Sequence, residues 1–213
     1  MRLATAYVRF YRAFNYDFLR KAHSNFSPDP WDAFEDGTDY PYIKIPIDSK
    51  LTCIVGANES GKSQLLDIIE CALGETQPDS SDFCRYSGFL SASGDLRLPD
   101  TGLHFEALTE VESSGLQDLL GRQGQPIESF RLFRVHPSRI EIFAENGTDP
   151  VVFSDDSEEA KKLTGLLPSV VRIEATRALP DSVPLDYLRS TNDDDSSGTR
   201  LGRAAQLQLL DSF

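Results

Sequence analysis

The chain has 213 residues, of which 34 are acidic and 21 basic, so its formal net charge is -13. This length suits one α/β domain with its own core, or one large lobe of a bigger assembly. The charge excludes a surface that is basic all over and coats nucleic acid unaided, and 39% hydrophobic with 26% charged residues excludes wholesale disorder.

Several features predict a soluble, cytoplasmic protein. The N-terminal segment lacks the long apolar region of a signal peptide, and no stretch approaches the length of a membrane-spanning helix. The cysteines have no metal-ligand spacing: Cys53 and Cys71 lie in segments that predict a core strand and a core helix, and Cys84 lies further along. Reduced, buried thiols are typical of the cytoplasm.

The first predicted elements are strands separated by a loop. Residues 2–14 mix β-branched, aromatic and basic residues, which indicates an opening strand. Residues 24–42 are rich in Pro, Asp and Ser and predict a surface loop. Isoleucines alternate over 43–47, the period of a strand with one buried face, and Pro46 favours an edge or a strand end. The continuous apolar run 51–55 predicts a central parallel strand covered on both faces.

Helices and strands then alternate irregularly. Apolar residues recur at helical spacing from Leu65 to Leu73, which predicts an amphipathic helix that ends at Gly74. Residues 75–102 are typical of a loop, 103–108 of a strand and 109–120 of a helix.

The next segment predicts β structure and then one more helix. Residues 130–153 carry strand patterns on both sides of Asn146-Gly147, a strong hairpin-turn signal. Residues 157–167 predict a helix that begins with acidic residues, and 170–175 predict another strand. The fold class is therefore α/β with an added antiparallel β region.

The C-terminal part differs in composition. Residues 190–199 are poor in apolar side chains and rich in Asp and Ser, which predicts a flexible acidic linker. Residues 200–213 begin a helical pattern that stops abruptly, so we expect the truncated start of a longer helix such as a coiled-coil insertion. The expected folded lobe is then 1–189.

The motif with the clearest chemistry is G-x-x-x-x-G-K-[ST], which fits between the predicted strand 51–55 and the helix. Its glycines let backbone N–H groups and the positive helix end point at phosphates. Lys62 is expected to reach the β- and γ-phosphates of ATP, and the Ser63 hydroxyl to ligate Mg²⁺. The predicted cofactor-binding residues are Gly56, Ala57, Asn58, Glu59, Ser60, Gly61, Lys62, Ser63 and Gln64.

With its Asn and Ser, the motif resembles that of the RecF/SMC/OLD-type ABC ATPases, an AAA-family group with a coiled-coil insertion. Residues 11–14, Tyr-Arg-Ala-Phe, stand where that family has Phe-Arg-Ser-Phe. Residues 167–173, with Arg177 and Leu179, are similar to the strand before the coiled coil in OLD-like members. The resemblance covers most of 2–190. It implies an N-terminal ABC-type lobe in which Arg12 lies beside the nucleotide and Asn58 shapes the loop.

The other parts of an ABC-type site are not visible. The family places a signature motif, an apolar strand ending in Asp-Glu and a switch histidine on a C-terminal lobe. The nearest imitation of that strand is 151–156, which would make Asp155 or Asp156 catalytic; the alternative is that residues 155–157 cap the following helix. Gln77 is either the family's Q-loop residue or part of an ordinary loop. The run 193–195 reads as solvated linker.

These observations predict the ATP- and Mg²⁺-binding half of an ABC-type ATPase. The resemblance implies nucleotide-driven head engagement that serves DNA maintenance (repair) or anti-phage (antiviral) defence, with DNA contacted through the full assembly and no membrane. Expected partners are a second ATPase lobe or a second copy of the chain, and a partner protein. The chain alone should hydrolyse little ATP. The alternatives are a nucleotide-sensing module without hydrolysis and a complete small P-loop NTPase that uses Asp155 or Asp156.

Overall fold

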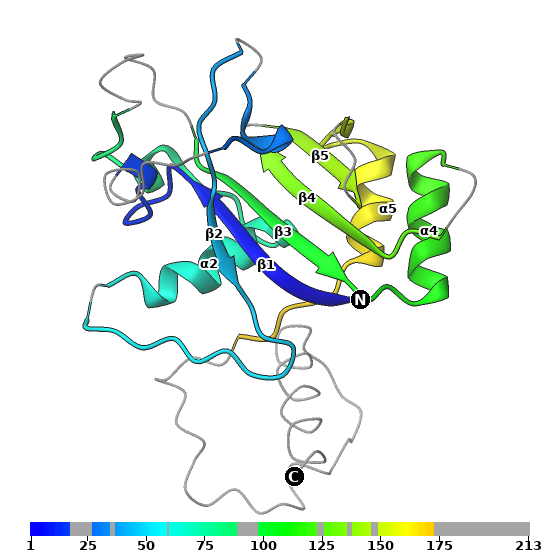
Figure 1. Cartoon of the computed structure of the whole chain (residues 1–213), viewed down its shortest axis with the longest axis horizontal. Coiled ribbons are helices and arrows are strands. Elements are labelled where there is room, and N and C mark those ends of the chain that lie inside the picture. Colours follow the sequence, from blue (N-terminus) through cyan, green and yellow to red (C-terminus); the bar gives the residue numbers. More distant parts are fainter. Residues whose placement is uncertain are drawn as a thin grey trace, which may run out of the picture. The chain divides into compact units, whose positions relative to one another are not determined.

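The chain forms two compact units, Met1–Pro168 and Ser169–Phe213, in the computed structural model (Figure 1). Of the second unit only residues 169–172 are described, and they are irregular. The fold that follows is that of the first unit. The described residues are 1–17, 27–34, 37–58, 60–88, 98–122, 126–135, 138–145 and 149–172.

A single six-stranded sheet organises the first unit, and all its described pairings are antiparallel. The strand order is β2-β1-β3-β4-β5-β6, so β2 lies at an edge, where Pro46 needs no ladder partner on its open side. The strands are β1 (Arg2–Arg9), β2 (Ile43–Pro46), β3 (Asp100–Glu106), β4 (Ser129–Val135), β5 (Arg139–Ala144) and β6 (Val151–Ser154).

The two faces of the sheet have separate cores because successive side chains of a strand point to opposite sides. On one face Val8 packs with Ile68 of helix α2 (Lys62–Leu73). On the other face Tyr7 packs with Tyr42, Phe133 and Phe143 in an aromatic cluster. The loop before β2 covers that aromatic face, and its Trp31 stacks on the ring of Phe133 with 5.8 Å between centroids.

A buried ion pair lies on the aromatic face. The Arg9 side chain is 2% exposed, and its Nε donates to Asp100 Oδ2 at 2.6 Å. Its guanidinium also lies over the rings of Phe34 and Tyr42, at 4.2 and 4.4 Å. Complete burial raises the pKa of Tyr42 well above its ordinary value, so its phenol stays neutral beside the pair. The charge of Arg9 is thus balanced by one carboxylate and two rings.

Helices cover the sheet face opposite the aromatic cluster, and local sequence signals determine where each helix begins and ends. Helix α4 (Glu110–Leu120) begins at Thr109, whose hydroxyl accepts from Glu112 N–H, and ends at Gly121 in the left-handed region. Helix α5 (Glu158–Leu166) lies beside α4 (Figure 1), close enough that a Cβ on Gly115 would lie 2.8 Å from Leu166 Cδ2. Two 3₁₀ turns complete the elements, η1 (Pro30–Asp32) and η2 (Ser80–Asp82).

The mixed α/β class is confirmed, and most predicted elements within the described residues are present. The helix that ends at Gly74 and the helix at 109–120 are both found, and β5 and β6 pair as a hairpin requires. The turn residues 146–148 lie outside the described residues, as do the predicted linker at 190–199 and helix at 200–213. No described helix has the length and apolar character needed to cross a membrane.

Three predicted strands differ from the structure. The first strand ends at Arg9 and not near residue 14, because the backbone turns through positive φ at Phe10 and Arg12. Residues 170–172 are irregular where a strand was expected, and 173–175 lie outside the described residues.

The third difference is the largest. Residues 51–55 form no strand and are exposed, so the prediction of a buried central strand is wrong for this chain. Cys53, expected in that core strand, is exposed as well, whereas Cys71 and Cys84 are buried. No described strand of the sheet pairs with 51–55, and an apolar run becomes a buried strand only where a partner covers it.

Candidate nucleotide-binding site

The P-loop, residues 56–63, leads into the N-terminus of α2. Gly61 is the N-cap of this helix and has φ 92° and ψ 7°, in the left-handed region where glycine is favoured. The turn lets α2 start immediately after the loop, so its first N–H groups have no partner within the helix. Those N–H groups and the positive end of the helix dipole make this terminus suited to an anion.

The side chains of Ser60 and Lys62 lie close to the backbone of the P-loop and keep it compact. A Cβ on Gly56 would lie 2.5 Å from Ser60 Oγ, so only glycine fits there without a shift. The Lys62 ammonium donates to two loop carbonyls, Gly56 O at 2.9 Å and Ala57 O at 2.5 Å. The lysine therefore already lies over the loop, and a phosphate bound there would take over its donors.

The predicted magnesium ligand is accessible. Ser63 lies in the first turn of α2 with an exposed side chain, next to the Lys62 donors. A serine hydroxyl at this point is suited to ligate a metal ion held between protein and phosphates. The helix end beside it is suited to the phosphates themselves. Asn58 is also exposed, and Glu59 lies outside the described residues. The described residues contain no group of three or more His, Cys, Asp or Glu side chains that could hold a metal by themselves.

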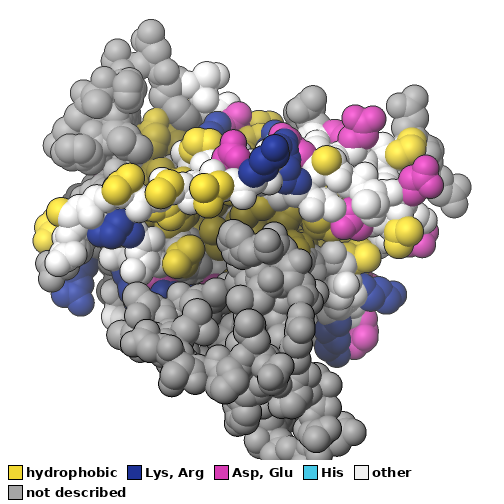
Figure 2. All heavy atoms as spheres, turned by 90° about the horizontal axis from the view of Figure 1, so that it is seen from below, with side chains coloured by type: hydrophobic (Ala, Val, Ile, Leu, Met, Phe, Trp, Pro, Cys, Tyr) yellow, Lys and Arg dark blue, Asp and Glu magenta, His cyan; other side chains and the backbone are white. Residues whose placement is uncertain are grey.

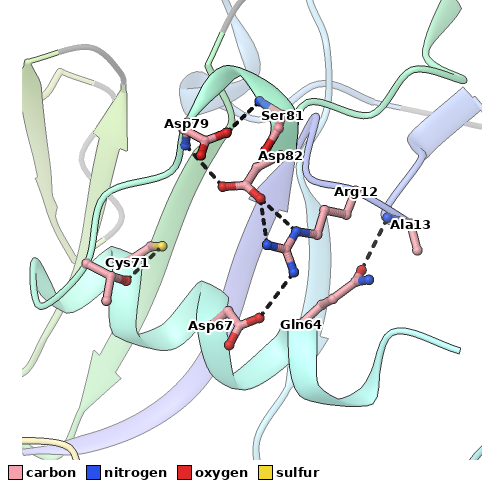
Figure 3. A network of polar contacts seen from close by, with 9 residues as sticks. Arg12, Ala13, Gln64, Asp67, Cys71, Asp79, Ser81 and Asp82 are labelled. Carbon is pink, nitrogen blue, oxygen red and sulfur yellow. Dashed lines mark hydrogen bonds and ion pairs between the residues drawn. The ribbon is translucent and has the colours of Figure 1, made fainter. Parts of the chain in front are cut away.

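Arg12 lies beside the P-loop helix, held by carboxylates (Figure 3). Its Nε and Nη2 are each 2.7 Å from Asp82 Oδ1, and its Nη1 is 3.6 Å from Asp67 Oδ2 on α2. The hydrogen bond with Asp82 is the main cause that raises the pKa of Arg12. The structure therefore brings Arg12 close to α2, and its contact with a nucleotide stays a prediction.

Gln64 joins the same region to α2. Its Oε1 accepts a hydrogen bond from Ala13 N–H at 3.3 Å (Figure 3), so in this structure Gln64 binds backbone next to Arg12. Gln77, the Q-loop candidate, is exposed in the loop after α2. Nucleotide contact by Gln64 and a Q-loop role for Gln77 stay predictions.

Asp155 has a different environment. It forms an ion pair with the buried Arg134, whose Nε and Nη2 donate to Ala72 O at 2.9 Å and Leu73 O at 3.4 Å. These carbonyls end α2, whereas the P-loop begins it, and a 12-residue helix is about 18 Å long. Asp155 therefore stabilises the far end of the P-loop helix, which favours a structural role over catalysis.

The neighbours of Asp155 support the capping alternative. Ser157 is the N-cap of α5, and its hydroxyl accepts from Ala160 N–H at 3.1 Å. Asp156 is exposed in the preceding turn. The cap is thus the serine, and the aspartates precede it.

Sequence reasoning missed the two carboxylates that hold Arg12. Asp67 lies within the amphipathic helix that the sequence predicts from Leu65 to Leu73, and Asp82 lies within the predicted loop 75–102. The only local signal for Asp82 was the Asp79-x-x-Asp82 spacing, which forms a capping box at η2. That spacing predicts a turn and says nothing of a distant arginine.

Comparison with known proteins identifies the class. A family model described as an AAA domain matches residues 35–166, more than half of the chain. The chain therefore belongs to this family of nucleotide-binding ATPase domains, and the expected class, a RecF/SMC-type ATPase lobe, is confirmed at that level.

Individual relatives are distant. No curated protein matches the chain. A similar solved structure comes from work on ATP-driven dimerization and DNA stimulated activation of SMC ATPases. Its TM-score is 0.37 and its sequence identity 13%, over 76% of this chain and 76% of that one.

Proposed function

We propose that this chain is the ATP- and Mg²⁺-binding half of an ABC-type ATPase, and that a second lobe completes its site. The observation that carries the proposal is the P-loop itself: left-handed Gly61, an accessible Ser63, and Lys62 placed over the loop carbonyls at the N-terminus of α2. These are the groups that hold a nucleoside triphosphate by its phosphates.

The need for a second lobe is supported by exposed apolar side chains. Leu51, Ile54 and Val55 are 79%, 39% and 90% exposed, directly before the P-loop. Figure 2 shows the molecule from below, with several hydrophobic side chains exposed among the described residues of that face. Burying one such side chain is worth about 1.5–3 kcal/mol, so a strand and a core supplied by another lobe would stabilise the segment strongly.

The chain's own residues perform the binding steps. Lys62 and the first N–H groups of α2 bind and orient the phosphates, and Ser63 offers its hydroxyl to the metal. Ser63 would hold Mg²⁺, which would supply positive charge next to the phosphates. The group that positions the attacking water is expected on the second lobe, because the described candidate Asp155 is paired with Arg134 at the other end of α2.

The biological role follows by analogy. The similar structure concerns an SMC ATPase described by its ATP-driven dimerization and its activation by DNA. For this chain we propose a second lobe or a second copy as partner, DNA contacted through the full assembly, and a role in DNA maintenance or anti-phage defence in the cytoplasm, as in OLD-like members.

A nucleotide-sensing module without hydrolysis is the other candidate. It is favoured by the same pairing of Asp155 with Arg134, which leaves the small-NTPase alternative with Asp156 alone as its candidate catalytic carboxylate. Turnover that rises when a second lobe is added would separate the ATPase from the sensor.

The test of nucleotide binding is calorimetry on the full chain with ATP and Mg²⁺. Lys62→Ala removes a charged donor to the phosphates and should weaken binding by on the order of 2 kcal/mol. Lys162→Ala, an exposed lysine on α5, is the matched control and should bind as the wild type does. If the wild type binds no ATP at millimolar concentration, or if both variants bind equally, the proposal is wrong.

A further inference from the structure

The chain is strained next to the P-loop. Phe10 and Arg12 have φ of 62° and 42°, in the left-handed region that residues with side chains seldom adopt. Both belong to the segment 10–14, here called the corner, where the chain turns away from β1. Strained backbone persists only where its surroundings hold it, and such positions gather at ligand sites and switches.

The surroundings of the corner show what holds it. Phe10 is buried and packs against Tyr40 and Phe83, with ring centroids 4.5 and 5.5 Å apart. Its carbonyl accepts from Cys84 N–H at 2.7 Å. The corner is therefore anchored to the segment that follows η2.

Arg12 holds the other half of the corner through Asp82. Arg12 N–H donates to Asp82 O at 2.7 Å, and the guanidinium donates twice to Asp82 Oδ1. The second carboxylate oxygen of Asp82 accepts from Asp79 N–H at 3.0 Å, so Asp82 is itself fixed in η2 (Figure 3). The strained residue is thus held by both its backbone and its side chain.

The corner in turn touches the P-loop. Ala13 N–H donates to Gln64 Oε1, in the first turn of α2. A Cβ on Gly61 would lie 3.8 Å from Ala13 Cβ and 3.9 Å from Phe14 Cε2. The left-handed glycine that starts α2 therefore lies against the corner, and a change in the corner reaches the phosphate-binding turn directly.

We propose that Asp82 and Arg12 are positioning residues for nucleotide binding, which hold the strained corner against Gly61 and Gln64 and so pre-organise the P-loop. This inference rests on the proposed function, since it concerns the same nucleotide site. Neither residue has to touch the nucleotide for the effect.

Pre-organisation has a kinetic consequence that direct contact does not share. If the P-loop is competent in only a fraction of molecules, the apparent dissociation constant rises by the inverse of that fraction. The loss of affinity appears as a slower association rate, because molecules that have bound ATP are already in the competent state. Loss of a direct contact to a phosphate instead appears mainly in the dissociation rate.

The test is stopped-flow binding of a fluorescent ATP analogue with Mg²⁺ to the full chain. Asp82→Asn keeps an oxygen for Asp79 N–H but loses the charge that holds Arg12, and Arg12→Ala removes the guanidinium while keeping the same backbone strain. Each should lower the association rate about threefold to fivefold, the scale of a partly exposed ion pair, and leave the dissociation rate unchanged. The double variant should match the single ones, because both act through one contact.

Control variants distinguish a failure of this inference from a failure of the proposed nucleotide-binding function. Asp118→Asn, an exposed aspartate on α4, should bind as the wild type does. If wild type and Lys62→Ala show the expected difference but Arg12→Ala and Asp82→Asn leave both rates unchanged, the inference is wrong and the proposed function stands. A faster dissociation rate with an unchanged association rate would also overturn it, in favour of direct contact by Arg12. If the wild type does not bind the analogue, both proposals fall.

Discussion

The ion pair between Asp155 and Arg134 allows a decisive test of what Asp155 does. The Arg134 side chain is 6% exposed and that of Asp155 is 23% exposed. Removing one partner of a buried pair costs about 3–5 kcal/mol. Here Ala72 O and Leu73 O still accept from Arg134 and water reaches the Asp155 side, so we expect Asp155→Ala to cost about 2–3 kcal/mol. That loss would lower the melting temperature by about 5–10 °C in a unit of this size.

The neighbouring aspartate provides the matched comparison. Asp156 is exposed in the same turn, so Asp156→Ala should change stability by no more than about 0.5 kcal/mol. Urea unfolding of the full chain, followed by circular dichroism, measures both variants, and ATP affinity should be unchanged in each. Equal losses in the two variants would refute the argument from the Arg134 pair. Robust ATP turnover that disappears only in Asp155→Ala, with the fold intact, would instead make Asp155 catalytic and the chain a complete small NTPase.

Three further predictions concern pH, assembly and DNA. Burial lowers the pKa of His104, so the unfolded state binds more protons than the folded state. The free energy of unfolding should therefore fall as the pH drops below about 6.5, and urea titrations should show a smaller fall for His104→Gln. Val55→Asn should change the stability of this chain by less than about 0.5 kcal/mol, yet weaken binding of a second lobe and the rise in ATP turnover that the lobe brings. Fluorescence anisotropy should show weak binding of duplex DNA at physiological salt, because a net charge of -13 leaves few spare cations.

Local patterns were sufficient for the parts of the fold that depend on near neighbours. Thr109 and Glu112 form the capping box of α4, and Gly74 ends α2 with φ 87° as a glycine after a helical pattern predicts. The alternating isoleucines of β2 and its edge position with Pro46 were also readable. In each case the atoms that stabilise the element lie within a few residues of one another.

The exposed run 51–55 shows where this reasoning fails. Its composition is that of a buried strand, and the prediction assumed that the rest of the chain would cover it. A strand needs a neighbour on its edge and side chains against its faces, and the described residues provide neither. The hydrophobicity of the segment therefore indicates that it is suited to burial, but it does not indicate which residues would bury it.

By itself the sequence predicted the P-loop motif, and it determined the order of most elements and the ATPase class, because each depends on residues close together in the chain. Only the tertiary structure decided which distant residues meet around that loop. Arg12 and Asp82 are 70 positions apart, and Arg134 on β4 is 21 positions from Asp155 in the turn after β6. No local spacing predicts such contacts, since they form only when the sheet, η2 and α2 have packed and placed their charges together.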